Sequence, residues 1–66
     1  MKWTDIEEIA EELDEKYPTE DILRLRFTTL FQYITSLDKF ADENNRCNEK
    51  ILEAIQASWI EVRSEK

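Results

Sequence analysis

KWTDIEEIAEELDEKYP, residues 2–18, carries carboxylates at seven of its thirteen positions 5–17. Apolar residues recur within it at spacings of three and four, which predicts an amphipathic helix. These apolar residues are Ile6, Ile9, Ala10, Leu13 and Tyr17. Thr4 and Glu7 fit a capping box at the start of this helix. Pro18 favours an end at the residue before it.

The acidic residues of this helix fall on the side opposite its apolar stripe. At about 100° per residue, five carboxylates share that side, and we call them the acidic face: Asp5, Glu8, Glu11, Glu12 and Glu15. Like charges four residues apart, such as Glu8 and Glu12, destabilise a helix by roughly 0.2–0.5 kcal/mol per pair. A basic protein surface or a cation would relieve this cost. A solvated face that only aids solubility is the alternative interpretation, and the residues alone leave both open.

The chain has 66 residues and a formal net charge of −7 at pH 7. Residues 1–21 hold nine acids and two bases, whereas residues 22–66 hold seven of each, so the excess charge lies in the first third of the chain. Nucleic acid would be repelled by such a surface, while a basic protein or a metal cation would be attracted. This length predicts a single domain, residues 1–66, with a thin core.

The residues that most enzymes use are scarce. The chain has no His, which removes the usual general base and the commonest metal ligand. The single Cys47 cannot form an internal disulfide, and we expect an inert residue near the start of the last helix. No phosphate loop or catalytic motif is present. The sequence therefore predicts a non-enzyme that is cytoplasmic, because no secretory or long apolar segment is visible, and that is monomeric and binds no membrane.

Two further helices are predicted. Leu23 to Phe27 alternates apolar and basic residues, which indicates a short extended segment. A second helix is expected to begin at Thr28 or Thr29, with a capping box from Thr29 to Gln32. Its inward residues are Leu30, Phe31, Ile34 and Leu37.

The remainder is predicted to be an irregular stretch followed by a long helix. Residues 38–48 form the irregular stretch, with Phe40 as its apolar anchor, and the last helix begins near Asn45 or Asn48. The inward residues of that helix are Ile51, Leu52, Ile55, Trp59 and Val62. The order of elements predicts a small, mainly α domain: three helices with a short extended segment, related to winged-helix modules.

Four short blocks of sequence resemble the IscX family of iron–sulfur cluster assembly proteins. They are KWTD at 2–5, YP at 17–18, RFT at 26–28 and NEKILEAI at 48–55. Together they span nearly the whole chain. The resemblance implies a modified winged-helix fold, docking on a cysteine desulfurase, and weak uptake of iron through exposed carboxylates.

The resemblance also implies which residues bind. Asp5, Glu8, Glu11 and Glu15 match the family's acidic helix, and Asp38, Asp42 and Glu43 match its second acidic stretch. The candidates for partner binding are thus Asp5, Glu8, Glu11, Glu12, Glu15, Asp38, Asp42 and Glu43. The candidates for a weak, exposed Fe(II) site are Asp5, Glu8, Glu11, Glu15, Asp42 and Glu43. Lys39, Ala41 and Thr29 stand where the family commonly has acids, which lowers the iron affinity that we expect.

These observations predict a non-catalytic acidic adaptor or regulator in iron–sulfur cluster assembly. It would dock on a basic patch of a cysteine desulfurase through the acidic face, contact other cluster-assembly proteins, and hold no tightly bound cofactor beyond weak Fe(II). The alternative is an iron-delivery protein comparable to frataxin, in which metal binding is the function. A winged-helix shape would also suit nucleic acid, but the charge opposes that interpretation.

Overall fold

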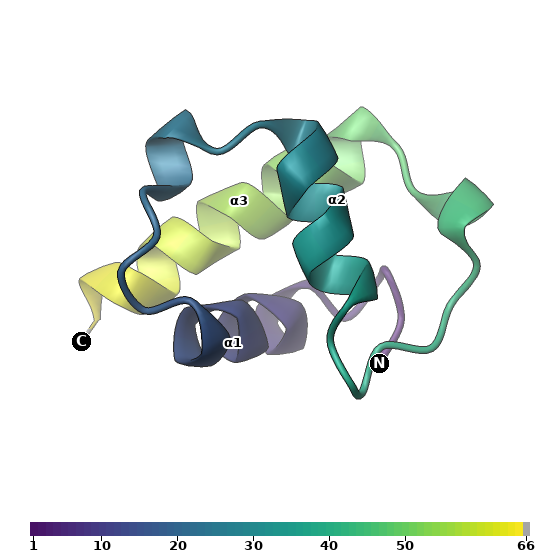
Figure 1. Cartoon of the computed structure of the whole chain (residues 1–66), viewed down its shortest axis with the longest axis horizontal. Coiled ribbons are helices and arrows are strands. Elements are labelled where there is room, and N and C mark those ends of the chain that lie inside the picture. The colour runs from purple at the N-terminus through teal and green to yellow at the C-terminus, as the bar shows by residue number, and fades with distance from the viewer. Residues whose placement is uncertain (66) are drawn as a thin grey trace.

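The computed structural model describes residues 1–65, which form three α-helices and two short 3-10 turns (Figure 1). In chain order they are α1 (Ile6–Lys16), η1 (Ile22–Arg24), α2 (Phe27–Thr35), η2 (Asn44–Arg46) and α3 (Glu49–Ser64). The prediction of a small, mainly α fold with three helices is confirmed. No β-strand accompanies the helices between residues 1 and 65. Within the same residues, no helix is long and apolar enough to cross a membrane.

α1 is the amphipathic helix that its spacing predicts. Ile9, Ala10 and Leu13 are fully buried, and α1 packs against α3. The helix ends at Lys16 with Tyr17 as its C-cap, which confirms the stop expected before proline. The C-terminal ends of α1 and α3 lie side by side (Figure 1).

The predicted start of α1 is wrong. The residue before the helix is Asp5 rather than Thr4, and its side chain makes no capping hydrogen bond. The Asp5 carboxylate instead accepts a hydrogen bond from the backbone N–H of Lys2 at 2.8 Å. The capping box between Thr4 and Glu7 therefore does not form, because Asp5 turns back toward the N-terminus.

The segment before α2 also differs from its prediction. Leu23 and Arg24 belong to the turn η1, and only Leu25 and Arg26 have extended backbone before α2 begins at Phe27. Because the helix begins earlier than expected, the predicted capping box from residue 29 to 32 lies inside it. The alternation of apolar and basic residues fits a tight turn followed by two extended residues as well as it fits a strand. The predicted extended segment was therefore too long.

The start of α3 is the one predicted helix start that the structure confirms. Asn48 precedes the helix, and its side-chain oxygen accepts a hydrogen bond from the backbone N–H of Ile51 at 3.0 Å. This cap satisfies one of the free N–H groups in the first turn. The inward face that follows is built on Leu52, Ile55 and Trp59, all buried.

One hydrophobic cluster joins the three helices. Its buried members are Trp3, Ile9, Ala10, Leu13, Ile22, Leu30, Ile34, Leu37, Leu52, Ile55 and Trp59. Trp3 stacks on Phe31 with ring centres 5.6 Å apart and meets Phe40 edge to face at 4.6 Å. Phe40 therefore anchors the loop between α2 and α3, as predicted.

Asp14 is the one buried charged residue among those that the structure describes, with 3% of its surface exposed. Its Oδ1 atom accepts hydrogen bonds from Trp59 Nε1 at 3.2 Å and from Arg63 Nε at 3.0 Å. Arg63 also donates to the carbonyl of Tyr17 at 2.8 Å and to that of Glu20. These bonds satisfy carbonyls just beyond the end of α1 and tie that end to the end of α3. Helical spacing does not predict this pair, because Asp14 and Arg63 lie 49 positions apart in the sequence.

We expect Asp14→Asn to lower the free energy of unfolding by about 2 kcal/mol. Removing one partner of a fully buried ion pair costs about 3–5 kcal/mol. The cost here is smaller because the Arg63 side chain is 31% exposed and water can partly solvate its charge. Urea unfolding of the variant would measure it. Glu15→Gln is the matched control on the exposed side of α1, with a change within about 0.5 kcal/mol. Equal effects of the two substitutions would contradict a structural role for the buried pair.

Candidate functional site

Three carboxylates of the acidic face point into solvent along one side of α1. Glu8, Glu11 and Glu15 are exposed. None of them has a Lys or Arg nitrogen within 4.0 Å in the part of the chain that the structure describes. Because α1 is packed against α3, these side chains project from a fixed backbone. The structure therefore presents a row of unpaired anions on α1, a helix that lies along one edge of the molecule (Figure 1).

The other two members of the acidic face are engaged within the chain. Glu12 Oε1 lies 3.4 Å from Lys39 Nζ, and Asp5 accepts the hydrogen bond from Lys2 described above. Lys39 is 71% exposed, so this ion pair contributes at most about 1 kcal/mol. The chain thus neutralises part of its acidic face at Glu12.

The structure brings Asp38 next to the acidic face. Asp38 is exposed at the end of α2, and it lines a shallow hollow with Glu12, Glu15, Lys16 and Lys39. A second shallow hollow at the start of α1 is lined by Asp5, Glu7, Glu8 and Glu11, together with Thr4 and Ile6. Glu7 was not among the predicted residues. Its position beside Glu8, in the first turn of the predicted helix, was the sequence signal that could have included it.

Asp42 has a structural role that its place in the predicted irregular stretch does not indicate. Its side chain is 10% exposed and accepts hydrogen bonds from the backbone N–H groups of Trp3 at 3.1 Å and Glu43 at 2.7 Å. These bonds, and more weakly the nearby Arg46, hold the pKa of the Asp42 carboxyl below its ordinary value of 3.8. The carboxylate therefore fastens the loop over Trp3.

Glu43 is also drawn into the loop. Its carbonyl accepts a hydrogen bond from Trp3 Nε1 at 2.8 Å, and its exposed carboxylate lies 3.8 Å from Arg46 Nε.

Over residues 1–65, no three His, Cys, Asp or Glu side chains gather closely enough to hold a metal ion. The residues predicted for Fe(II) are thus spread along a surface and do not converge on one point: Asp5, Glu8, Glu11, Glu15, Asp42 and Glu43.

Cys47 is half-buried before α3, where its Sγ lies 3.8 Å from the carbonyl oxygen of Asn48. Burial raises the pKa of the thiol. A raised pKa reduces the thiolate at neutral pH, so the environment of Cys47 disfavours nucleophilic attack.

Comparison with known proteins agrees with these features. A family model described as iron-sulphur cluster assembly matches residues 1–64. The chain belongs to this family, the IscX family. A similar curated protein, an uncharacterized protein of Pseudomonas aeruginosa, is 48% identical over 63 residues, which are 96% of each chain. Membership indicates a role in iron–sulfur cluster assembly and partnership with the cluster-assembly machinery.

In this IscX-family chain, Asp42→Asn should lower stability at neutral pH, with a difference from the unchanged protein that disappears in acid. The folded-state pKa of Asp42 is depressed. Its contribution is therefore complete above 3.8 and is lost as the pH falls through the folded-state value. Denaturant unfolding followed by tryptophan fluorescence at several pH values measures this difference. Asp38→Asn, an exposed acid of the same loop, is the control and should show no such pH dependence. A difference for Asp42→Asn that stays constant down to pH 2 would contradict the prediction.

Proposed function

We propose that this protein is a non-catalytic adaptor that docks on a basic patch of a cysteine desulfurase through the acidic face of α1. The observation that supports the proposal most directly is the set of three exposed carboxylates, Glu8, Glu11 and Glu15, without an ion pair among the described residues. They project from a helix whose opposite side is buried. A basic partner would therefore meet carboxylates carried on a preformed helix and would have to order only their side chains.

The repulsion between neighbouring glutamates explains why such a row would favour binding of a basic partner. The pairs Glu8–Glu12 and Glu11–Glu15 each destabilise α1 by roughly 0.2–0.5 kcal/mol while the protein is alone. Positive charge on a partner attracts these carboxylates and so offsets the repulsion between them. Complementary charge of this kind speeds encounter and fixes orientation more than it adds affinity. Docking should also weaken with salt, because exposed charges are screened over about 10 Å at 0.1 M.

Three of the remaining predicted residues adjoin this row of carboxylates. Asp5 and Glu12 complete the acidic face, and Asp38 extends it at the end of α2. Asp42 and Glu43 contribute their charge, while their hydrogen bonds shape the loop. Other proteins of cluster assembly would compete for the same surface if they carry a similar basic patch.

Reversing three charges on the acidic face should abolish desulfurase binding. The variant Glu8→Lys, Glu11→Lys, Glu15→Lys removes the row while leaving the buried stripe of α1 unchanged. The matched control reverses three exposed acids of α3: Glu49→Lys, Glu53→Lys and Glu61→Lys. Both variants change the net charge equally, so only the position differs.

The measurement is calorimetric titration against the cysteine desulfurase of the same cell at low and at high salt. We expect binding by the unchanged protein and by the control, weaker at high salt, and none by the α1 variant. Equal loss in both variants would show that net charge alone acts, which contradicts a docking face on α1.

We further propose that the same carboxylates take up Fe(II) weakly as a consequence of their charge. The hollow at the start of α1, lined by Asp5, Glu8 and Glu11, favours accumulation of a cation. The same hollow is the observation that supports the alternative function, iron delivery. A single helix face offers few oxygens in one place, so an ion there would keep most of its water.

Anaerobic titration of isotope-labelled protein distinguishes docking from delivery. We expect Fe(II) to shift the amide signals of residues 5–11 only at millimolar metal, and Mg(II) to shift the same signals similarly. Saturation at micromolar Fe(II) without competition from Mg(II) would instead favour iron delivery. Glu53→Gln on α3 is the control for nonspecific charge loss and should change neither titration.

A further inference from the structure

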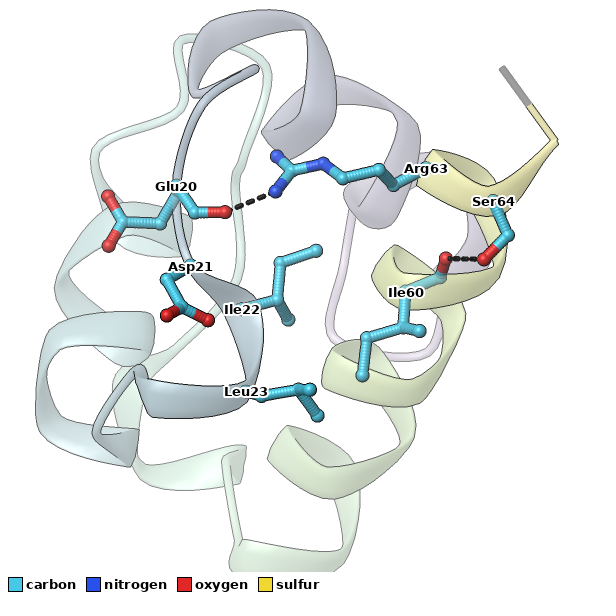
Figure 2. A pocket seen from close by; sticks show the side chains of 7 residues that line it. All are labelled: Glu20, Asp21, Ile22, Leu23, Ile60, Arg63 and Ser64. Atoms are coloured by element: carbon cyan, nitrogen blue, oxygen red, sulfur yellow. Dashed lines mark hydrogen bonds between the residues drawn. The ribbon is translucent and has the colours of Figure 1, made fainter.

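Lys39 is the one basic residue whose side-chain nitrogen lies within 4.0 Å of an acidic-face carboxylate among residues 1–65. Its Nζ lies 3.4 Å from Glu12 Oε1. Arg63, by contrast, extends from α3 to the carbonyl of Glu20, as Figure 2 shows, and its Nε pairs with the buried Asp14. Within these residues, the acidic face therefore receives a counter-charge from its own chain at one carboxylate.

The backbone around Lys39 is held in place, although its side chain is exposed. The carbonyl of Lys39 accepts a hydrogen bond from the ammonium group of Met1 at 2.7 Å, and the N–H of Ala41 donates to the carbonyl of Met1 at 2.9 Å. The residue between them, Phe40, packs edge to face on the buried Trp3. The loop therefore keeps the base of the Lys39 side chain at a fixed place beside α1.

Lys39 and Lys16 border the acidic face on the same side. At about 100° per residue, Lys16 lies beyond Glu12 in the direction away from Glu11 around α1. Lys16 is exposed and lines the same shallow hollow as Lys39, Glu12 and Asp38. Among the described residues, the hollow at the start of α1 is lined by four acids and no base. The two lysines therefore mark one boundary of the acidic face.

Lys39 makes Glu12 a poorer contact for a basic partner. A cation of the partner that approached Glu12 would also approach the Lys39 ammonium group, and repulsion between unit charges about 4 Å apart in water reduces binding about fivefold. Glu8 and Glu11 carry no such penalty, because neither has a Lys or Arg nitrogen within 4.0 Å among residues 1–65. The dipole of α1 adds only about half a positive charge at its start, which the four acids there outweigh.

We propose that Lys39 determines how a basic partner is oriented on α1, because it shields Glu12 and directs the partner's cations to the row of Glu8, Glu11 and Glu15. This inference rests on the docking proposed above and assigns unequal roles to the carboxylates of the acidic face. An exposed ion pair contributes little to stability, so Lys39 acts through the charge that the partner meets. Specificity can come from repulsion in a wrong arrangement as well as from attraction in the right one.

The test is a titration of isotope-labelled protein with an oligolysine peptide at low salt, followed through the side-chain carboxyl carbon signals of the glutamates. The peptide supplies positive charge without a partner's shape, so it reports where cations bind. We expect the signals of Glu8, Glu11 and Glu15 to shift more than that of Glu12. Lys39→Gln should strengthen binding about fivefold and raise the Glu12 shift to the size of the others.

Two variants control for net charge and for the side chain itself. Lys50→Gln removes an exposed lysine at the start of α3 and changes the net charge equally, so it should strengthen binding much less. Lys39→Arg keeps the charge and should bind the peptide as the unchanged protein does. Urea unfolding checks that each variant is folded.

Three outcomes of the peptide titration would overturn the proposal. They are equal strengthening by Lys39→Gln and Lys50→Gln, a Glu12 shift in the unchanged protein as large as that of Glu8, and weaker binding by Lys39→Gln.

Titration of the same variants against the desulfurase separates this proposal from docking itself. We expect Lys39→Gln to bind the desulfurase more tightly than Lys50→Gln does. If the desulfurase binds all the variants alike, the role of Lys39 fails and docking stands. If it does not bind the unchanged protein, the proposed function fails, and the assignment of an orienting role to Lys39 fails with it.

Discussion

The ion pair between Asp14 and Arg63 fixes the direction in which α1 faces. α1 has acids on most of its circumference, so the apolar stripe alone leaves room for some rotation. Asp14 follows Ala10 by one turn on the same side of the helix and enters the core to meet Arg63 and Trp59. Because a buried carboxylate needs these partners, only one rotation satisfies it. That rotation leaves Glu8, Glu11 and Glu15 in solvent.

The cations of the chain pair with the carboxylates that have structural roles and leave the exposed row of α1 unpaired among residues 1–65. Arg63, Arg46 and Lys39 each lie near a carboxylate of another element or loop: Asp14, Asp42 and Glu12 respectively. These contacts hold helix ends and the loop between α2 and α3. They leave the middle of the acidic face without a cation among residues 1–65. The excess negative charge is thus concentrated where the backbone is rigid, which is the arrangement that favours a basic partner.

The elements that sequence predicted well are those with local causes. The stripe of α1, its stop before Pro18 and the Asn48 cap of α3 each depend on residues within one or two turns. The exposure of Glu8, Glu11 and Glu15 follows from the same periodicity. These parts needed no knowledge of the rest of the chain.

The features that sequence reasoning missed depend on distant residues. Asp14 is buried because of Arg63, which lies 49 positions later, and Asp42 is engaged by Trp3, 39 positions earlier. Local spacing contains no information on such contacts, so it identifies no partner for either acid. The turn at Ile22–Arg24 was missed for a similar reason: α3 holds it through Gln56.

Mapping the desulfurase complex residue by residue tests the central claim most directly. Isotope-labelled protein would be mixed with unlabelled desulfurase at low salt, and the loss of amide signal intensity would be followed along the chain. Docking through α1 predicts early loss at Glu8, Glu11 and Glu15, with residues 49–53 of α3 little affected. Early loss on α3 with α1 unchanged would contradict the claim that the exposed anions of α1 meet the partner.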